Sequence, residues 1–66
     1  MRLSYNKLWK TLIDRGLKRV ELKTMASISS SSLAKLGKNE PVSFDVIYKI
    51  CEALNCNIGD VVEFVK

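Results

Sequence analysis

The chain has 66 residues, of which 47% are hydrophobic and 27% charged, and it carries a net charge of +4 at pH 7. This length predicts one domain spanning residues 1–66 and excludes two independently folding ones. No apolar run approaches the roughly 18 residues of a membrane span. The first residues also lack the apolar stretch of a secretory signal, so we expect a cytoplasmic protein without membrane contact.

The first predicted element is an amphipathic helix near the N-terminus. Its inward stripe follows the spacing i, i+3, i+4, i+7 and i+8 and comprises Tyr5, Leu8, Trp9, Leu12 and Ile13. Ser4 or Asn6 is expected to cap the start of this helix, and the pair Arg15-Gly16 is expected to end it. We interpret Tyr5 and Trp9 as core aromatics rather than as exposed stacking platforms.

A second, shorter helix is predicted from about Arg19 to Met25. Lys18 is a poor N-cap, so the start of this helix is weakly marked. The residues expected to face inward are Val20, Leu22 and Met25 or Ala26.

The run of four serines at 29–32 resembles low-complexity sequence. However, Ser29 is a good N-cap, and Leu33 and Leu36 follow at i, i+3 spacing. This pattern favours the first turn of a third helix, closed by Asn39 in a left-handed conformation.

The segment Glu40–Val42 is predicted to be a loop because Pro41 cannot continue a helix. Ser43 then caps a fourth helix that ends at Leu54, with inward residues Phe44, Ile47, Ile50, Cys51 and Leu54. A fifth, short helix is predicted to start at Asn57–Asp60, to carry Ile58, Val61 and Val62, and to end near Phe64–Lys66. No segment clearly predicts a strand, although the β-branched residues of 61–65 allow an extended end. The expected fold class is all-α, with five short helices.

The two cysteines, Cys51 and Cys56, are interpreted as reduced, small hydrophobic residues in or near the core; a redox switch is the alternative. The chain has no histidine, and two thiolates alone do not make a structural zinc site. Cys51 has no general base to activate it, and the sequence has no glycine-rich phosphate loop. We therefore expect neither an enzyme nor a bound metal, cofactor or small-molecule ligand.

Charge is unevenly distributed along the chain. Residues 1–38 carry nine basic and two acidic side chains, a net charge of +7, whereas residues 39–66 carry two basic and five acidic ones, a net charge of −3. Such an asymmetry attracts polyanions to one part of a small molecule. The alternative is a solvated basic surface that has no partner.

The segment from Arg19 to about Leu36 resembles the helix-turn-helix motif of the Cro and phage-repressor family. The five hydrophobic positions of that motif are occupied by Leu22, Ala26, Ile28, Leu33 and Leu36. The downstream stretch 46–60 is similar to the last two helices of a subfamily of small bacterial regulators, and the likeness extends from Tyr5 to Val65. The resemblance implies a lambda-repressor-like domain of bacterial or phage origin.

The resemblance also implies which residues contact double-stranded DNA. Ser30, Ser31 and Lys35 match positions that usually face bases. Five residues match positions that contact the DNA backbone or cap the helix beside it: Arg19, Ser29, Ser32, Lys38 and Asn39. Lys10 and Lys23 are expected to add non-specific attraction. For each serine, a purely structural role as a helix cap is the alternative, and for Lys35 a solvated surface position.

Two residues depart from the family pattern. The family prefers Ala or Gly where Lys23 stands, so we expect the stem of this lysine to lie along the surface. Ser27 occupies a turn position usually held by glycine, and it must adopt either a costly left-handed conformation or an altered turn.

The leading hypothesis is a sequence-specific DNA-binding regulator, a repressor that acts as a homodimer with its third helix in the major groove. The alternative is a protein-interaction module, similar to an antitoxin or an anti-regulator, that keeps the fold without reading DNA. Phe64 and Val65 are interpreted as either a cover of the core or part of a dimer interface.

Overall fold

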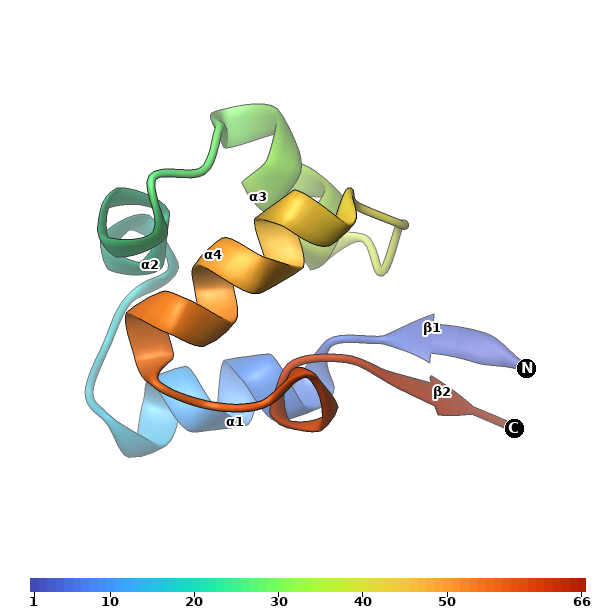
Figure 1. Cartoon of the computed structure of the whole chain (residues 1–66). Helices are drawn as coiled ribbons and strands as arrows, with labels where there is room; N and C mark the ends of the chain where they lie inside the picture. Colours follow the sequence, from blue (N-terminus) through green and yellow to red (C-terminus); the bar gives the residue numbers. More distant parts are fainter.

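The computed structural model describes residues 1–66 and contains four α-helices, one 3-10 turn and two short strands. The elements follow in the order β1 (Arg2–Ser4), α1 (Asn6–Asp14), α2 (Arg19–Ala26), α3 (Ser30–Gly37), α4 (Phe44–Leu54), η1 (Ile58–Asp60) and β2 (Glu63–Val65). In Figure 1, α4 crosses the middle of the molecule, with α1 below it, α2 to its left and α3 above it. None of the helices has the length and apolar character needed to cross a bilayer.

The prediction of five helices and no strand is wrong at both ends of the chain. β1 and β2 form a two-stranded antiparallel sheet in which Leu3 pairs with Phe64, so the two termini lie side by side (Figure 1). Three-residue strands are too short to show a period of two, and each finds its partner at the other end of the chain. The extended end expected from the β-branched residues is confirmed by β2.

The expected fifth helix is the single 3-10 turn η1. The backbone N–H of Asn57 donates to Oδ2 of Asp60 at 3.1 Å, which closes this turn as a local unit. Val61 and Val62 follow it directly, and β-branched residues disfavour helix continuation. Val61 is fully buried and therefore still serves the core.

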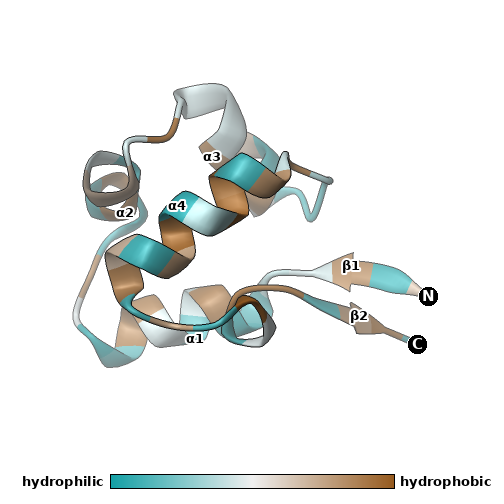
Figure 2. Ribbon diagram, in the orientation of Figure 1, coloured by the Kyte–Doolittle hydropathy of each residue, from teal (hydrophilic) through white to brown (hydrophobic).

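The hydrophobic core lies between the helices and is built mainly from pairs spaced three or four residues apart. Each of the four helices contributes to it, and the buried apolar residues are Tyr5, Leu8, Leu12, Leu22, Ala26, Ile28, Leu36, Ile47, Ile50, Leu54 and Val61. Figure 2 shows the resulting alternation of hydrophobic and polar positions along α4. Burial of each large aliphatic side chain contributes about 1.5–3 kcal/mol.

Three residues expected in the core are exposed instead. Ile13 is 76% exposed in the last turn of α1, and Phe44 is 73% exposed at the first residue of α4. Both overhang the ends of their helices, where no other element covers them. Val20 is 59% exposed, because the packed face of α2 is defined by Leu22 and Ala26 and position 20 lies away from it. Of the two options near the end of α2, Ala26 is the buried residue and Met25 is exposed.

All four helices end in the same hydrogen-bonded turn. In each, a left-handed residue is followed by one whose N–H donates to the carbonyl five residues earlier, the Schellman motif. The left-handed residues are Gly16, Ser27, Asn39 and Asn55. The closing bonds run from Leu17 to Leu12 (2.8 Å), Ile28 to Lys23 (3.2 Å), Glu40 to Lys35 (2.9 Å) and Cys56 to Cys51 (3.0 Å). The expected roles of Gly16 and Asn39 are thereby confirmed.

Tyr5 links the start of α1 to the end of α3. Its backbone N–H donates to Oδ1 of Asn39 at 3.3 Å, and its hydroxyl donates to the carbonyl oxygen of Glu40 at 2.8 Å. The ring is fully buried, and burial raises the pKa of the Tyr5 hydroxyl above its usual value of 10.0. The N-terminal segment is therefore fastened to the loop that follows α3. The expected cap at Ser4 or Asn6 is not found, because the N-cap of α1 is Tyr5 and no side chain caps the helix. Oγ of Ser4, one residue before the N-cap, accepts instead from the N–H of Asn6 at 3.2 Å.

Candidate nucleic-acid interface

The turn between α2 and α3 is held in a strained conformation by Ser27. This residue has φ 53° and ψ 44°, which is the left-handed option anticipated from the sequence. A residue with a Cβ adopts this conformation at a cost of about 1–2 kcal/mol. The turn nevertheless forms because its 3.2 Å closing bond is made and because Ile28, the next residue, is buried in the core. The direction in which α3 leaves α2 is thus fixed by packing.

The N-terminus of α3 is organised by a cluster of serine hydroxyls. Oγ of Ser29 accepts from the backbone N–H of Ser32 at 3.1 Å, which confirms Ser29 as the N-cap. The Ser29 hydroxyl donates to that of Ser32 at 3.0 Å and lies 3.1 Å from that of Ser31. Because a hydroxyl has one hydrogen to donate, the donor of Ser29 is used inside the cluster. The serine run is therefore a structured cap and not a linker.

Ser30 and Lys35 are the polar residues of α3 whose side chains are free of internal partners. Ser30 is exposed, and none of the hydrogen bonds of the serine cluster involves its hydroxyl. Lys35 is exposed four residues after Ser31, so the two share one face of the helix. Ala34, which the sequence alone did not indicate, is exposed four residues after Ser30. That spacing was the available signal for a third position on this face.

Arg19 lies at the first residue of α2 and is held by two other helices. Its guanidinium carbon lies 3.9 Å from the centroid of the Trp9 ring, a cation–π contact with α1. A Cβ added at Gly37, the last residue of α3, would lie 3.3 Å from Nη1 of Arg19. Glycine at this position therefore leaves room for the guanidinium. Trp9 packs against the core as expected, but it also serves as the base on which this arginine rests.

Lys38 and Asn39 form the end of α3. Lys38 is exposed directly after the last residue of the helix. Asn39 has φ 57°, and its side-chain oxygen is used by the N–H of Tyr5, which leaves its amide NH₂ group as the free donor. The structure thus places Lys38, Asn39 and Arg19 toward the C-terminal end of α3, whereas the serines lie at its N-terminal end.

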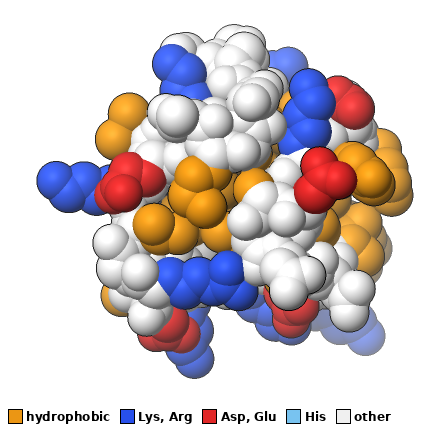
Figure 3. All heavy atoms as spheres, turned by 60° about the vertical axis from the view of Figure 1, so that its left-hand side comes forward, with side chains coloured by type: hydrophobic (Ala, Val, Ile, Leu, Met, Phe, Trp, Pro, Cys, Tyr) orange, Lys and Arg blue, Asp and Glu red, His pale blue; other side chains and the backbone are white.

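The basic residues of the motif are not neutralised within the chain. The two ion pairs join Lys7 to Glu63 at 3.6 Å and Lys49 to Asp45 at 3.3 Å, and neither involves residues 18–38. Figure 3 shows Lys and Arg side chains, with Asp and Glu side chains among them, around a face that also carries hydrophobic side chains on the side of α2. Lys23 is half-buried, which agrees with a stem that lies along the surface. Unpaired cations keep their full attraction for a polyanion.

The structure contains no group of three or more metal-binding side chains. The interface described above is a surface of hydroxyl groups and cations. Such a surface can donate hydrogen bonds and attract negative charge.

Comparisons with known proteins agree with this arrangement. The model of the Cro/C1-type HTH DNA-binding domain matches residues 7–66. Among solved structures, the crystal structure of transcriptional regulator VanUg, form II, is 58% identical in sequence, with a TM-score of 0.90. The match covers 94% of this chain and 83% of that chain. No curated protein matches.

The family match covers nearly the whole chain and includes both helices of the motif. It confirms the resemblance read from the hydrophobic positions of residues 19–36, and it refers to a family of DNA-binding domains and not to a class of enzymes. The protein therefore belongs to the Cro/C1-type helix-turn-helix family of DNA-binding domains.

Proposed function

We propose that this protein is a sequence-specific regulator of transcription that binds double-stranded DNA with α3 in the major groove. The observation that carries the proposal is the exposed face of α3, where the Ser30 hydroxyl and the Lys35 ammonium group have no partner in the chain. The major groove is about 12 Å wide and admits one helix with small side chains against the base edges. A helix start made of serines meets that steric requirement.

Base contacts are assigned to Ser30, Ser31 and Lys35. The lysine donates to O6 and N7 of guanine, and a serine hydroxyl serves as donor or acceptor to any base. Ala34 lies on the same face, and its methyl group suits contact with the methyl group of thymine. These few contacts predict modest direct readout, supplemented by DNA shape.

Backbone contacts are assigned to the two ends of α3. At the start of α3, Ser29 and Ser32 are assigned to a phosphate group of the DNA backbone. The hydroxyl hydrogen of Ser32 is the free donor for this contact. At the end of α3, phosphate contacts are assigned to Arg19, Lys38 and Asn39. Because the Trp9 ring holds the guanidinium of Arg19 in place, little side-chain entropy is lost when it meets a phosphate.

The protein is proposed to act as a homodimer and as a repressor. One small domain makes few phosphate contacts, so useful affinity requires two half-sites about one helical turn apart. Phe64 is 70% exposed in β2 and therefore does not cover the core, which leaves the dimer interface as its proposed role. A dimer bound across a promoter represses by occupying it.

The proposal is tested by affinity selection from random duplexes of about 30 base pairs, a length that holds two half-sites. Enrichment of a two-fold symmetric motif is expected. A bound but unselected pool would contradict sequence-specific reading and indicate attachment through phosphates alone. No retention even at low salt would contradict DNA binding and favour a protein-interaction module of the antitoxin or anti-regulator type.

The roles of single residues are tested on the selected motif. In Lys35→Ala, the difference in binding free energy between the selected base pair and its replacements is expected to fall by about 1–3 kcal/mol at one position of the site. Titration against single-base variants of the site measures this difference. Lys66→Ala removes the same charge outside the motif and serves as the matched control. Arg19→Ala is expected to weaken all sequences alike and to reduce the salt dependence of binding. Unchanged binding in both motif variants would contradict the proposed interface.

A further inference from the structure

The Schellman turn at the end of α4 brings the two cysteines together. Asn55 is left-handed with φ 52°, and its N–H donates to the carbonyl oxygen of Glu52 at 3.3 Å. The N–H of Cys56 donates to the carbonyl oxygen of Cys51 at 3.0 Å. This pair of bonds characteristically places the side chains of its two outer residues, here Cys51 and Cys56, in contact.

The backbone geometry is compatible with a disulfide bond. With standard bond lengths, the 3.0 Å hydrogen bond between Cys56 N and Cys51 O keeps the two Cα atoms no more than about 6.9 Å apart. The usual separation of the Cα atoms in a disulfide, about 4.4–6.8 Å, lies below that limit. The same backbone bond therefore favours closure of a short ring at the end of α4.

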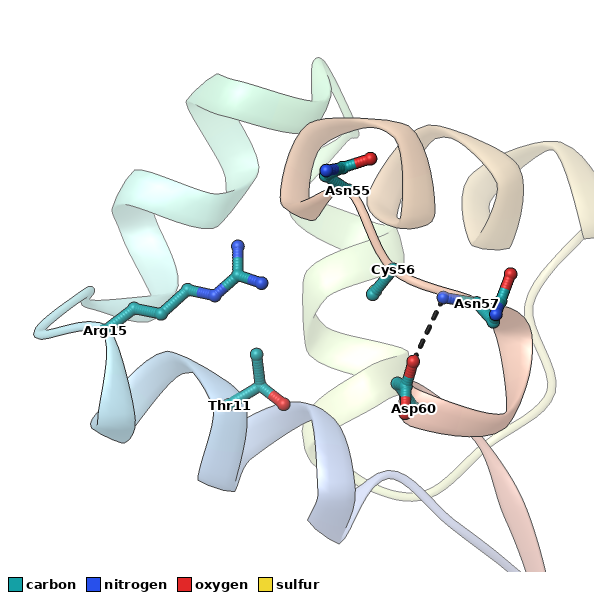
Figure 4. A pocket seen from close by; sticks show the side chains of 6 residues that line it. All are labelled: Thr11, Arg15, Asn55, Cys56, Asn57 and Asp60. Atoms are coloured by element: carbon teal, nitrogen blue, oxygen red, sulfur yellow. Dashed lines mark hydrogen bonds between the residues drawn. The ribbon is translucent and has the colours of Figure 1, made fainter.

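The two cysteines differ in whether they line an open hollow. Cys56 lines a polar hollow of about 560 Å³ together with Thr11, Arg15, Asn55, Asn57 and Asp60. Figure 4 shows the Arg15 side chain extending from the end of α1 across this hollow toward Cys56 and Asn55. Cys51 lies on α4 and does not line the hollow. Burial raises the pKa of the Cys51 thiol, and the neighbouring Cys56 raises it further.

We propose that Cys51 and Cys56 form a site of reversible oxidation, in which exchange with a low-molecular-weight disulfide converts the two free thiols into an intramolecular disulfide. Both cysteines are free in the structure, and both pack against the core while remaining partly accessible. This assignment is independent of DNA binding.

The exchange proceeds in two balanced steps. First, the thiolate of Cys56 attacks one sulfur of the small disulfide, whose S–S bond breaks, and one small thiolate leaves. Second, Cys51 loses its proton and attacks the sulfur of Cys56, which forms the Cys51–Cys56 bond and releases the second small thiolate. Overall, two protein thiols are oxidised, and one small disulfide is reduced to two small thiols. Cys56 is assigned as the first nucleophile because it lines the open hollow and Cys51 does not.

The new bond would lock the end of α4 beside the helix-turn-helix turn. A hollow on that side is lined by Met25, Ala26 and Ser27 of the motif and by Lys49, Glu52 and Ala53 of α4. Glu52 and Ala53 lie next to Cys51 along the chain, so the disulfide stabilises the helix end on which α2 rests. The residues of α3 are not part of this site.

The test compares the disulfide equilibrium in the folded and unfolded chain. The protein is equilibrated in mixtures of oxidised and reduced glutathione, with and without denaturing urea, quenched in acid, and analysed by mass spectrometry. We expect loss of two hydrogens in the folded monomer, with an equilibrium constant at least about tenfold larger than in urea. By thermodynamic linkage, the folding equilibrium constant of the oxidised chain must then exceed that of the reduced chain by the same factor, which urea denaturation of the two forms measures.

Single variants identify the order of attack. Cys51→Ser is expected to accumulate the glutathione adduct on Cys56. Cys56→Ser is expected to react more slowly, because Cys51 does not line the hollow and burial raises the pKa of its thiol. An equilibrium constant in the folded wild-type chain equal to or below that in urea would overturn the proposal. So would accumulation of glutathione adducts or of disulfide-linked dimers instead of the intramolecular bond. The wild-type measurement does not depend on whether either variant folds.

Discussion

Helices α3 and α4 both pack against the core but use their surfaces differently. α4 buries Ile47, Ile50 and Leu54, whereas α3 buries only Leu36 and presents a face of serines, Ala34 and Lys35. The stability of the domain is therefore concentrated in α4, and its capacity for recognition is concentrated in α3. This division allows the exposed residues of α3 to vary with little effect on folding.

The largest effect on the comparison is expected from Leu54→Ala. Leu54 is fully buried, and removal of a buried leucine side chain costs about 2–5 kcal/mol through lost transfer energy and the cavity left behind. Urea denaturation measures the loss. Lys35→Ala is the control on α3, and its free energy of unfolding should stay within about 0.5 kcal/mol of the wild type. A similar loss in both variants would refute the division between the helices.

Ser29→Ala tests whether the serine cluster also contributes to stability. The substitution removes the acceptor for the Ser32 N–H, and loss of an N-cap costs about 1 kcal/mol. Ser30→Ala, one residue later, removes an exposed hydroxyl that takes no part in the cluster and should change stability little. Thermal or urea melts of the two variants distinguish the cap from the exposed face. Equal stabilities would mean that the hydrogen bond from the Ser32 N–H to the Ser29 hydroxyl does not contribute to stability.

Tyr5→Phe tests the link between α1 and the end of α3, and it predicts a pH dependence. Loss of the hydrogen bond to Glu40 is expected to cost about 1 kcal/mol at neutral pH. Because burial raises the folded-state pKa of Tyr5 above 10.0, the neutral hydroxyl is favoured in the native state. The wild type should therefore keep its full stability below pH 10 and lose part of it as the pH rises through the folded pKa. The variant should lack this component, so the stability difference between the two chains should shrink above pH 10.

The smallest effect is expected from Ser27→Gly, and it is stabilising. Glycine adopts the left-handed conformation of this turn without the Cβ penalty, although it also adds entropy to the unfolded chain. We expect a net gain of about 0.5–1 kcal/mol, measured by urea denaturation. Asn55→Gly is a useful comparison, because asparagine already tolerates this conformation and should gain less. A loss of stability in Ser27→Gly would show that the serine side chain contributes to the turn.

The sequence predicted the features that depend on local pattern. The four α-helices, the caps at Ser29 and Ser43, and the left-handed conformation of Asn39 follow from spacing and from short-range hydrogen bonds. It did not predict the sheet, because the pairing of Leu3 with Phe64 joins two distant segments and neither segment shows it by its own pattern. Ile13 and Phe44 fit the helical period, but whether another element covers a helix end is a tertiary property.

The same distinction applies to the interface. The motif positions were assigned from the hydrophobic spacing of residues 19–36, and the family match over residues 7–66 confirms the resemblance on which that assignment rests. The contact of Arg19 with Trp9 could not be predicted from the sequence, because the two residues lie on different helices and are ten positions apart. Nor could the sequence show that the donor of Ser29 is used within its own cluster. Both facts depend on three-dimensional proximity.

The pairing of the terminal strands has a consequence for the order in which the domain opens. Leu3 pairs with Phe64, 61 positions away, and Arg2 pairs with Val65, 63 positions away, so the pairing of the two strands encloses all four helices. In an unstructured chain, closing such a loop carries an entropic cost that grows with its length. Folded helices bring the two ends together beforehand, which makes the strands the last elements to form and the first to separate. The amide protons of β1 and β2 should then exchange with solvent long before those of the α4 core.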